Sequence, residues 1–325
     1  MSRFTGKRVL VTGGAGFIGS NLTDHLLTEG AFVRVLDNFS TGFRKNLANA
    51  EKNPNFELIE GDIRDRECCD RATKSMDYVL HQAALGSVPR SIKDPATSIG
   101  VNVFGFTNIL HSAVENKVKR FVFASSSSVY GDEKTLPKVE ERTGKALSPY
   151  AISKQSNETI ALNFASLYGI EVIGLRYFNV FGPRQNPAGA YAAVIPKFIG
   201  MMLAHNSPVI NGDGSSSRDF TFVDNVTEAN CLALLADSEA CSKMYNISCG
   251  SELDLNELFE LLRQELSEYD NQIANLSAQH GASRTGDIPH SLGSISLAQK
   301  HLGYKILVSV KDGLHRTCEW FCKNR

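Results

Sequence analysis

The chain has 325 residues, of which 42% are hydrophobic and 21% are charged, and its formal net charge is −1. This composition is that of a folded globular protein, long enough for one large or two ordinary domains with a full hydrophobic core. The near-zero charge excludes a global basic field that would recruit nucleic acid or an anionic membrane, so a few local basic residues must hold any anionic ligand. No apolar run reaches the length of a bilayer span and no signal peptide precedes the first predicted strand, so we expect a cytoplasmic protein without membrane contact.

The seven cysteines do not form a recognisable metal site or disulfide framework. Neither Cys68 with Cys69 nor Cys318 with Cys322 has zinc-site spacing or histidine partners. We therefore expect reduced thiols, in the core or at the surface, and no bound metal.

The segment VLVTGGAGFIG at 9–19 is the first stretch that indicates a ligand. An apolar run gives way to Gly13, Gly16 and Gly19, and an amphipathic segment follows. This pattern predicts a strand, a glycine turn and a helix, in which the N–H groups at the helix N-terminus hold a pyrophosphate. Because such turns are common between strands and helices, the pattern alone gives only weak support for a dinucleotide.

An acidic residue at the end of the next predicted strand strengthens this interpretation. Alternating apolar residues predict a strand at 32–36, and Asp37 follows it, 18 positions after Gly19 (37 − 19 = 18). A carboxylate at this place accepts hydrogen bonds from the adenosine ribose hydroxyls and repels a 2′-phosphate, which favours NAD over NADP. Arg44 and Lys45 lie close enough in the sequence to keep NADP as the alternative.

Strands and helices then alternate up to about residue 124. We expect strands at 56–59, 78–81 and 121–124, and helices at 64–73 and from 106 to 114. This alternation predicts an α/β fold with a doubly wound parallel sheet. Asp62, just after the third strand, can accept from an adenine amino group or cap the next helix. Gln82, Ala83 and Ala84 leave room for a cofactor at the end of the fourth strand.

Tyr150 and Lys154 are the residues most suited to proton transfer. Ser148 and Pro149 predict the start of a helix, which places Tyr150 and Lys154 four positions apart on one helix face. A free tyrosine has a pKa of about 10, and a nearby ammonium and the positive end of a helix both favour its phenolate. The spacing occurs by chance on many helices, but it gains weight here from the glycine turn and from four serines at 125–128.

These motifs together resemble the extended short-chain dehydrogenase/reductase superfamily, over residues 8–320. Within it, the chain is most similar to nucleotide-sugar 4-epimerases, and to the branch that acts on UDP-N-acetylhexosamines. The stretches that carry this resemblance are HQAALGSVPRS at 81–91, RYFNVFGPRQNP at 176–187, AYAAVIPKF at 190–198 and INGDGSSSRDF at 210–220. The resemblance implies an NAD-binding Rossmann domain at 1–178 and a smaller, mainly substrate-binding α/β lobe at 179–325, with some segments returning to the Rossmann lobe.

The resemblance also implies a catalytic trio of Ser126, Tyr150 and Lys154. Ser126 would hydrogen-bond the sugar 4-oxygen and help to pass a proton to or from Tyr150, while Lys154 would also hold the nicotinamide ribose. NAD would take a hydride from C4 and return it to the other face of a 4-keto sugar. Related dehydratases carry an Asp and a Glu at the positions of Ser127 and Ser128, and decarboxylating relatives a Glu at the latter. Two hydroxyls there favour epimerisation.

The remaining site residues follow from the same resemblance. The expected NAD contacts are Gly13, Gly16, Phe17, Ile18, Gly19, Asp37, Asn38, Ser40, Gly42, Asp62, Ile63, Gln82, Ala83, Ala84, Asn102, Tyr150, Lys154 and Tyr177. The expected substrate contacts are Ser87, Arg90, Ser126, Ser127, Ser128, Tyr150, Asn179, Ala193, Val194, Lys197, Asn211, Arg218, Arg284, Asp287 and Ser291. Asn179, Arg218 and Arg284 match residues that hold the UDP diphosphate. Asp287 matches an acid that binds the uridine ribose.

Small residues around the sugar indicate an N-acetylated substrate. Where the family has a large aromatic gate residue in enzymes confined to glucose and galactose, this chain has Ser291, and Ser87 and Ala193 are small as well. We therefore expect reversible 4-epimerisation of UDP-N-acetylglucosamine to UDP-N-acetylgalactosamine for surface polysaccharide precursors. The resemblance implies a homodimer that pairs the helix near Asn102 with the helix at 157–168.

Two alternatives stay open. The first is 4-epimerisation of UDP-N-acetylglucosaminuronate and its galacto epimer, with Arg90 as a candidate partner for the C6 carboxylate. The second is a non-catalytic NAD-binding regulator on the same fold, which would predict a broken Tyr-Lys pair.

Overall fold

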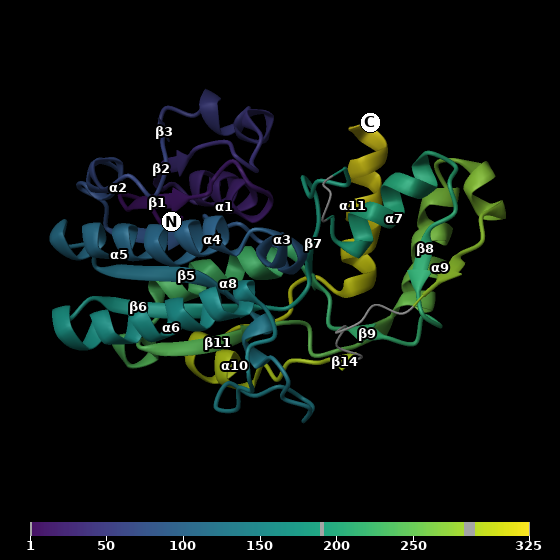
Figure 1. The fold of residues 1–325 in the computed structure, drawn as a ribbon. Coiled ribbons are helices and arrows are strands. Elements are labelled where there is room, and N and C mark those ends of the chain that lie inside the picture. Colours follow the sequence, from purple (N-terminus) through teal and green to yellow (C-terminus); the bar gives the residue numbers. More distant parts are fainter. Residues whose placement is uncertain (1, 189–191, 283–289, 325) are drawn as a thin grey trace.

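A seven-stranded sheet forms the centre of one lobe of the molecule (Figure 1). The computed structural model describes residues 2–188, 192–282 and 290–324. The strands of the sheet are β1 (Arg8–Thr12), β2 (Phe32–Asp37), β3 (Phe56–Glu60), β4 (Tyr78–His81), β5 (Arg120–Ser126), β6 (Glu171–Tyr177) and β11 (Lys243–Ile247). They lie in the order β11-β6-β5-β4-β1-β2-β3, and all neighbours pair in parallel. The predicted doubly wound α/β fold is confirmed, and its strand order reverses between β1 and β4, where ligands bind in such sheets.

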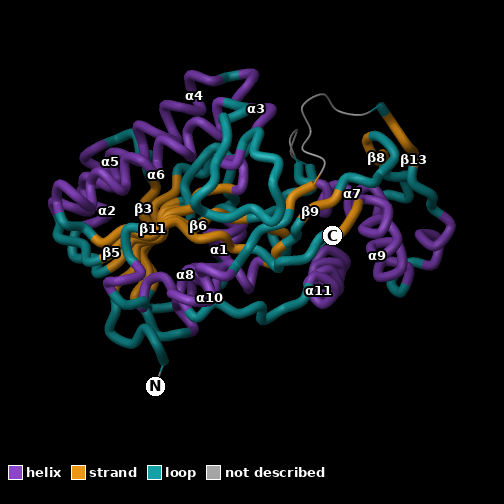
Figure 2. The backbone as a smooth tube through the Cα atoms, turned by 90° about the horizontal axis from the view of Figure 1, so that it is seen from below, coloured by secondary structure: helices purple, strands orange, loops and turns teal. Residues whose placement is uncertain are grey.

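Helices cover both faces of this sheet (Figure 2). One face carries α2 (Arg66–Thr73), α3 (Val88–Lys93), α4 (Pro95–Ile99), α5 (Phe106–Glu115) and α6 (Pro149–Tyr168), and the other carries α1 (Phe17–Thr28), α8 (Val223–Leu235) and α10 (Ser296–Leu302). A π-helical turn at Gly100–Gly105 joins α4 to α5. Each face has its own apolar cluster, one with Phe106 and Ala161 and the other with Leu22 and Val226.

A second lobe stands beside the sheet lobe and has its own core (Figure 1). Its helices are α7 (Val194–Leu203), α9 (Leu255–Ser267) and α11 (Val310–Lys323), and Phe198, Leu258 and Leu314 pack between them. Its strands are short: β7 (Val180–Phe181), β8 (Val209–Asn211), β9 (Ser217–Arg218), β10 (Thr221–Phe222), β12 (Leu253–Asp254), β13 (Gln279–Gly281) and β14 (His290–Ser291). Between α7 and α9 the chain returns to the sheet lobe and supplies α8 and β11.

Capping residues begin the helices that position the site. Ser148 accepts a hydrogen bond from Ala151 N (3.1 Å), and Pro149 is the first residue of α6, as the sequence predicts. Asp65 caps α2 by accepting from Glu67 N and Cys68 N, so the alternative role of Asp62 as that cap is wrong. Among the described residues, no helix combines the length and apolar character that crossing a bilayer requires.

Candidate active site

A cavity of about 520 Å³ lies at the carboxyl edge of the sheet. Its wall contains the glycine turn, the ends of β2 to β5 and the beginning of α6, together with segments that follow β6. The expected cofactor residues that line it are Gly13, Gly16, Phe17, Ile18, Gly19, Asp37, Asn38, Ser40, Asp62, Ile63, Gln82, Ala83, Ala84, Tyr150, Lys154 and Tyr177. Residues far apart in the sequence thus meet around one cavity, as the strand-end argument predicts.

The glycine turn forms a cradle that side chains would fill. Gly13 has a φ of +69°, and a Cβ atom on it would lie 2.7 Å from Ala83 N. A Cβ on Gly19 would lie 2.1 Å from Gly13 O, so α1 begins directly against the turn. Gly16, the cap of α1, offers no side-chain acceptor to the first N–H groups of the helix. These groups fit the pyrophosphate of a dinucleotide.

Two acids lie at the ends of β2 and β3. Asp37 is buried, and its carboxylate accepts hydrogen bonds from Ala15 N (2.9 Å) and Phe39 N (2.8 Å). Burial raises its pKa, and these two N–H groups oppose that effect. The hydrogen-bonded guanidinium of Arg64 lowers the pKa of Asp62 to about 2, so this carboxylate stays ionised.

The basic residues near this edge are engaged elsewhere. Arg44 pairs with Glu51 (3.0 Å), and the Lys45 ammonium lies 5.6 Å from the centre of the Phe43 ring. Neither Arg44 nor Lys45 lines the cavity among the residues that the structure describes. This arrangement favours NAD over NADP, because neither Arg44 nor Lys45 lies in the described wall beside Asp37, where a 2′-phosphate would need a cation.

Two expected NAD contacts, Gly42 and Asn102, lie outside the cavity lining and contact residues next to it. Gly42 packs against the glycine turn, where a Cβ on it would lie 2.7 Å from the carbonyl carbon of Ala15. Asn102 is buried, accepts from Leu85 N (2.8 Å) and donates to Ser153 Oγ (3.2 Å). Neither residue lines the described cavity, because each is used to fix the backbone that does.

Ser126, Tyr150 and Lys154 meet at the end of β5. The Lys154 ammonium donates to Ala124 O (2.7 Å) and lies 5.8 Å from the centre of the Tyr150 ring. Burial lowers the pKa of Lys154 to about 8 and raises the pKa of Tyr150, while a hydrogen bond with Ser126 acts in the opposite direction on the tyrosine. Burial outweighs that hydrogen bond, so the pKa of Tyr150 lies above its ordinary value in the protein without ligands. That the lysine and the helix end favour the phenolate stays a prediction.

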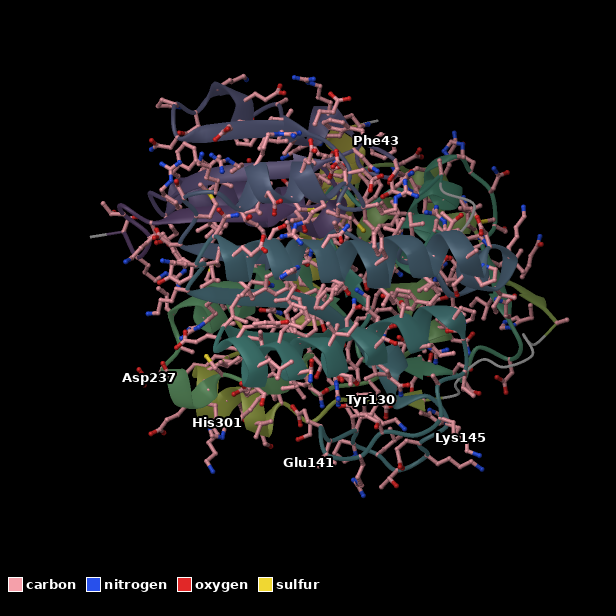
Figure 3. The ribbon with its side chains drawn as sticks, turned by 60° about the vertical axis from the view of Figure 1, so that its left-hand side comes forward. Phe43, Tyr130, Glu141, Lys145, Asp237 and His301 are labelled. Atoms are coloured by element: carbon pink, nitrogen blue, oxygen red, sulfur yellow. The ribbon has the colours of Figure 1, made fainter. Side chains whose placement is uncertain are left out.

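A buried ion pair that the sequence analysis missed stands behind this trio. Glu158, one helical turn after Lys154 on α6, accepts from Ser125 Oγ (2.5 Å) and pairs with Arg176 (2.8 Å). Arg176 also donates to the hydroxyl of Tyr130 (3.1 Å). In the view of Figure 3, Tyr130, Glu141 and Lys145 lie toward the end of the molecule that is opposite Phe43. The four-residue spacing of Lys154 and Glu158 was the available signal, since it places them on one helix face.

A second polar cluster links β4, β6 and α8. The Tyr177 hydroxyl accepts from Asn230 Nδ2 (2.8 Å), and Gln82 Nε2 donates to Asn230 Oδ1 (3.2 Å). Asn230 is fully buried and does not appear among the residues predicted from the sequence. Because it comes from the segment that returns to the sheet lobe, only the tertiary structure identifies it.

The expected substrate residues divide into two groups. Those that line the described cavity are Ser126, Ser127, Tyr150, Asn179 and Ala193. Those that lie outside its described lining are Ser87, Arg90, Ser128, Val194, Lys197, Asn211, Arg218 and Ser291. Arg284 and Asp287 lie outside the described residues. Lining residues that were not predicted are Leu36, Thr41, Gly61, Leu85, Gly86, Val101, Ala124, Ser125, Val180 and Gln185.

Several residues of the second group have defined structural places. Ser87 caps α3 by accepting from Arg90 N (3.1 Å). Ser291 belongs to β14 and pairs in register with Arg218 on β9. Among the described residues, the buried hydroxyl of Ser128 has no hydrogen-bond partner.

The chain is similar to known enzymes over almost its whole length. Residues 9–248 match the model of the NAD dependent epimerase/dehydratase family. A putative UDP-glucose 4-epimerase of Methanocaldococcus jannaschii is 38% identical, over 97% of this chain and 99% of that protein. The UDP-N-acetylglucosamine 4-epimerase of Methanobrevibacter ruminantium, solved with UDP-N-acetylmuramic acid, has a TM-score of 0.93 and 36% identity, over 99% of this chain and 100% of that chain.

A UDP-glucose 4-epimerase of Thermotoga maritima, solved with UDP-glucose, gives a TM-score of 0.90 at 36% identity, over 98% of this chain and 99% of that chain. Relatives that share the whole length and the fold at this identity establish the family. The chain belongs to the NAD-dependent epimerase/dehydratase family, and it is an NAD-dependent enzyme of the nucleotide-sugar 4-epimerase kind.

Proposed function

We propose that this enzyme interconverts UDP-N-acetylglucosamine and UDP-N-acetylgalactosamine in the cytoplasm, for the synthesis of surface polysaccharide precursors. The observation that supports this proposal best is the grouping of Ser126, Tyr150 and Lys154 at one end of the NAD cavity. The neighbouring positions hold the hydroxyls of Ser127 and Ser128, which cannot serve as the acid and base of a dehydration.

The residues of the trio divide the chemistry among them. Bound NAD supplies a hydride acceptor that later returns the hydride. Tyr150 removes the proton of the sugar 4-hydroxyl as the 4-keto sugar forms and gives it back afterwards. Ser126 holds the 4-oxygen and the tyrosine hydroxyl together. Lys154, fixed by its hydrogen bond to Ala124 O, keeps a positive charge near the Tyr150 phenolate, which accepts the proton and is regenerated when the proton is returned.

Small side chains support the choice of an N-acetylated sugar. Ala193 lines the cavity at the start of α7, and Ser291 stands beside Arg218 across the β9 and β14 pair. We propose that Arg218 holds the diphosphate, so a small residue at 291 leaves volume for an acetamido group near the sugar ring. A tyrosine at this position would occupy that volume.

Product analysis by NMR tests the proposal directly. The purified protein, without added cofactor, is incubated separately with UDP-N-acetylglucosamine, UDP-N-acetylglucosaminuronate and UDP-glucose. We expect the 4-epimer of the neutral acetylated sugar, because NAD undergoes no net reduction and stays bound. Turnover of the uronate alone would contradict the proposed substrate and make Arg90 the residue to change next. No turnover on any of the three, even with NAD added, would favour the non-catalytic regulator.

We also propose that two copies of the chain pair through α6 and the adjoining π-helical turn. Apolar side chains on these elements lie exposed in the single chain: Phe104, Ile152, Leu162, Leu167 and Tyr168. Exposed large apolar residues on neighbouring helices are typical of a protein interface. Light scattering should give the mass of a dimer for the natural protein, and that of a monomer for Leu167→Asp.

A further inference from the structure

Asp219 is a buried acid outside the catalytic trio, and it joins several parts of the substrate side. It lies between β9 and β10 and is 0% exposed. Its carboxylate accepts three backbone hydrogen bonds, from Cys249 N (2.8 Å), Gly250 N (3.1 Å) and Gly293 N (3.2 Å). Cys249 and Gly250 follow β11 directly, so the acid is attached to the edge of the main sheet.

The backbone of the same residue contacts two expected substrate residues. Asp219 O accepts from the side-chain amide of Asn179 (3.0 Å), and Asp219 N donates to Ser291 O (2.7 Å). Arg218 directly precedes Asp219 in the chain, so the backbone hydrogen bonds of Asp219 also fix the position of Arg218. One residue therefore fixes the mutual positions of Asn179, Arg218 and Ser291, which come from three separate segments.

Close packing holds this junction rigid. A Cβ atom on Gly293 would lie 2.8 Å from Ser248 Oγ and 2.9 Å from the Phe178 ring, so the chain segment after Ser291 packs tightly against the residues that follow β6 and β11. Ser248 Oγ donates to Gly293 O (3.2 Å). Burial raises the pKa of Asp219 to about 6, although the three N–H groups oppose this rise, so at pH 8 the carboxylate is ionised and accepts all three bonds.

We propose that Asp219 is a positioning residue for UDP, which ties the diphosphate-binding and gate segments of the second lobe to the edge of the NAD-binding sheet. This inference rests on the proposed function in that Asn179 and Arg218 are taken to hold the UDP diphosphate. The Asp219 carboxylate is fully buried and does not line the described cavity, so we place it in direct contact with neither NAD nor UDP. It acts through the backbone positions of residues 179, 218 and 291.

The test is the variant Asp219→Asn at pH 8, with UDP binding measured by calorimetry and turnover measured on the sugar that the natural protein accepts. An amide has one acceptor oxygen and places an NH₂ group against a backbone N–H, so at least one of the three bonds is lost. We expect UDP to bind about tenfold more weakly and KM to rise by a similar factor, with a smaller change in kcat and unchanged NAD content. A merely structural role would lower Tm but leave KM and UDP affinity unchanged.

Asp254→Asn is the matched control. Asp254 pairs with Ser217 across the β12 and β9 strands and accepts from Glu257 N (2.8 Å) as the cap of α9, a role that Asn performs equally well. Its UDP affinity should equal that of the natural protein. If Asp219→Asn does not fold, Ser248→Ala, which removes a hydroxyl that hydrogen-bonds Gly293 O and the Asp219 side chain, should weaken UDP binding by about two- to fivefold.

The outcomes separate this inference from the proposed function. Unchanged UDP affinity in a folded Asp219→Asn, or in Ser248→Ala where the first variant is unfolded, overturns the role of Asp219. A natural protein that binds UDP but yields no epimer removes the proposed function, while the affinities of the variants still decide the role of Asp219. A natural protein that does not bind UDP overturns both.

Discussion

The cofactor part and the proposed substrate part of the site are built in different ways. The NAD side uses one continuous strand, turn and helix, in which Gly13 and Gly19 bring backbone N–H groups to the ligand. The proposed substrate side takes Asn179, Arg218 and Ser291 from separate segments that meet through Asp219. A local motif can therefore build the first side, whereas the second depends on the way the lobes pack. Substitutions on the NAD side should change NAD content, whereas those on the proposed substrate side should change the affinity or the selectivity for UDP-sugars.

The largest effect is expected from Tyr150→Phe, which acts where the two sides meet. Loss of the hydroxyl removes the proton carrier, so turnover should fall by about 10³-fold or more. NAD content should stay unchanged, because the backbone and the ring remain. Tyr168→Phe, an exposed tyrosine on the same helix, serves as the control. An active Tyr150→Phe enzyme would exclude the tyrosine from the chemistry.

Gly13→Ala should weaken NAD binding and leave the substrate residues unchanged. The residue has a φ of +69°, and its new Cβ would lie 2.7 Å from Ala83 N. The alanine would therefore be destabilised both by backbone strain and by this steric clash. Backbone strain of this kind costs about 1–3 kcal/mol, and we expect NAD content to fall by about tenfold or more. Gly6→Ala provides the control, because Gly6 has a φ of +76° and open space around it. Equal NAD content in both variants would show that the close approach does not matter.

Ser291→Tyr should change the substrate side and leave NAD binding intact. The aromatic ring would fill the space proposed for the acetamido group, so the ratio of kcat/KM for UDP-N-acetylglucosamine over UDP-glucose should fall by about tenfold or more. Turnover of UDP-glucose is the internal control for folding and NAD content. An unchanged ratio would place the acetamido group elsewhere.

The smallest effect is a pH-dependent change in stability from Lys154→Met. Burial lowers the pKa of Lys154 in the folded protein to about 8, below the value of about 10.5 for an unfolded lysine. The folded state therefore binds fewer protons than the unfolded state between these values, and the lysine contributes more stability as the pH rises through this window.

Thermal unfolding of the NAD-free proteins at pH 7 and pH 9.5 measures this change. The Tm of the natural protein should rise relative to that of Lys154→Met as the pH increases. Lys323→Met, at an exposed position on α11, should show no such trend. Parallel pH profiles for the natural protein and Lys154→Met would mean that Lys154 titrates normally.

Local sequence patterns are enough to predict the sheet lobe and most of the cavity wall on the cofactor side. Alternating strands and helices, the glycine turn and Asp37 lie within single βα units, where spacing fixes which side chains reach the strand ends. The same local logic placed Tyr150 and Lys154 on one helix face behind the Ser148 cap. A family resemblance supplied the expected substrate and the proposed roles of Asn179, Arg218 and Ser291.

The surroundings of those residues depend on long-range packing. Asn230 and Asp219 reach their partners from segments that lie far away in the sequence, since β11 and α8 return to the sheet after the second lobe has begun. The direction of the Tyr150 pKa also depended on packing, because burial outweighs the hydrogen bond with Ser126. Spacing along a chain fixes which side chains share a face of a helix or strand, but burial and long-range hydrogen bonds depend on how the lobes close on each other.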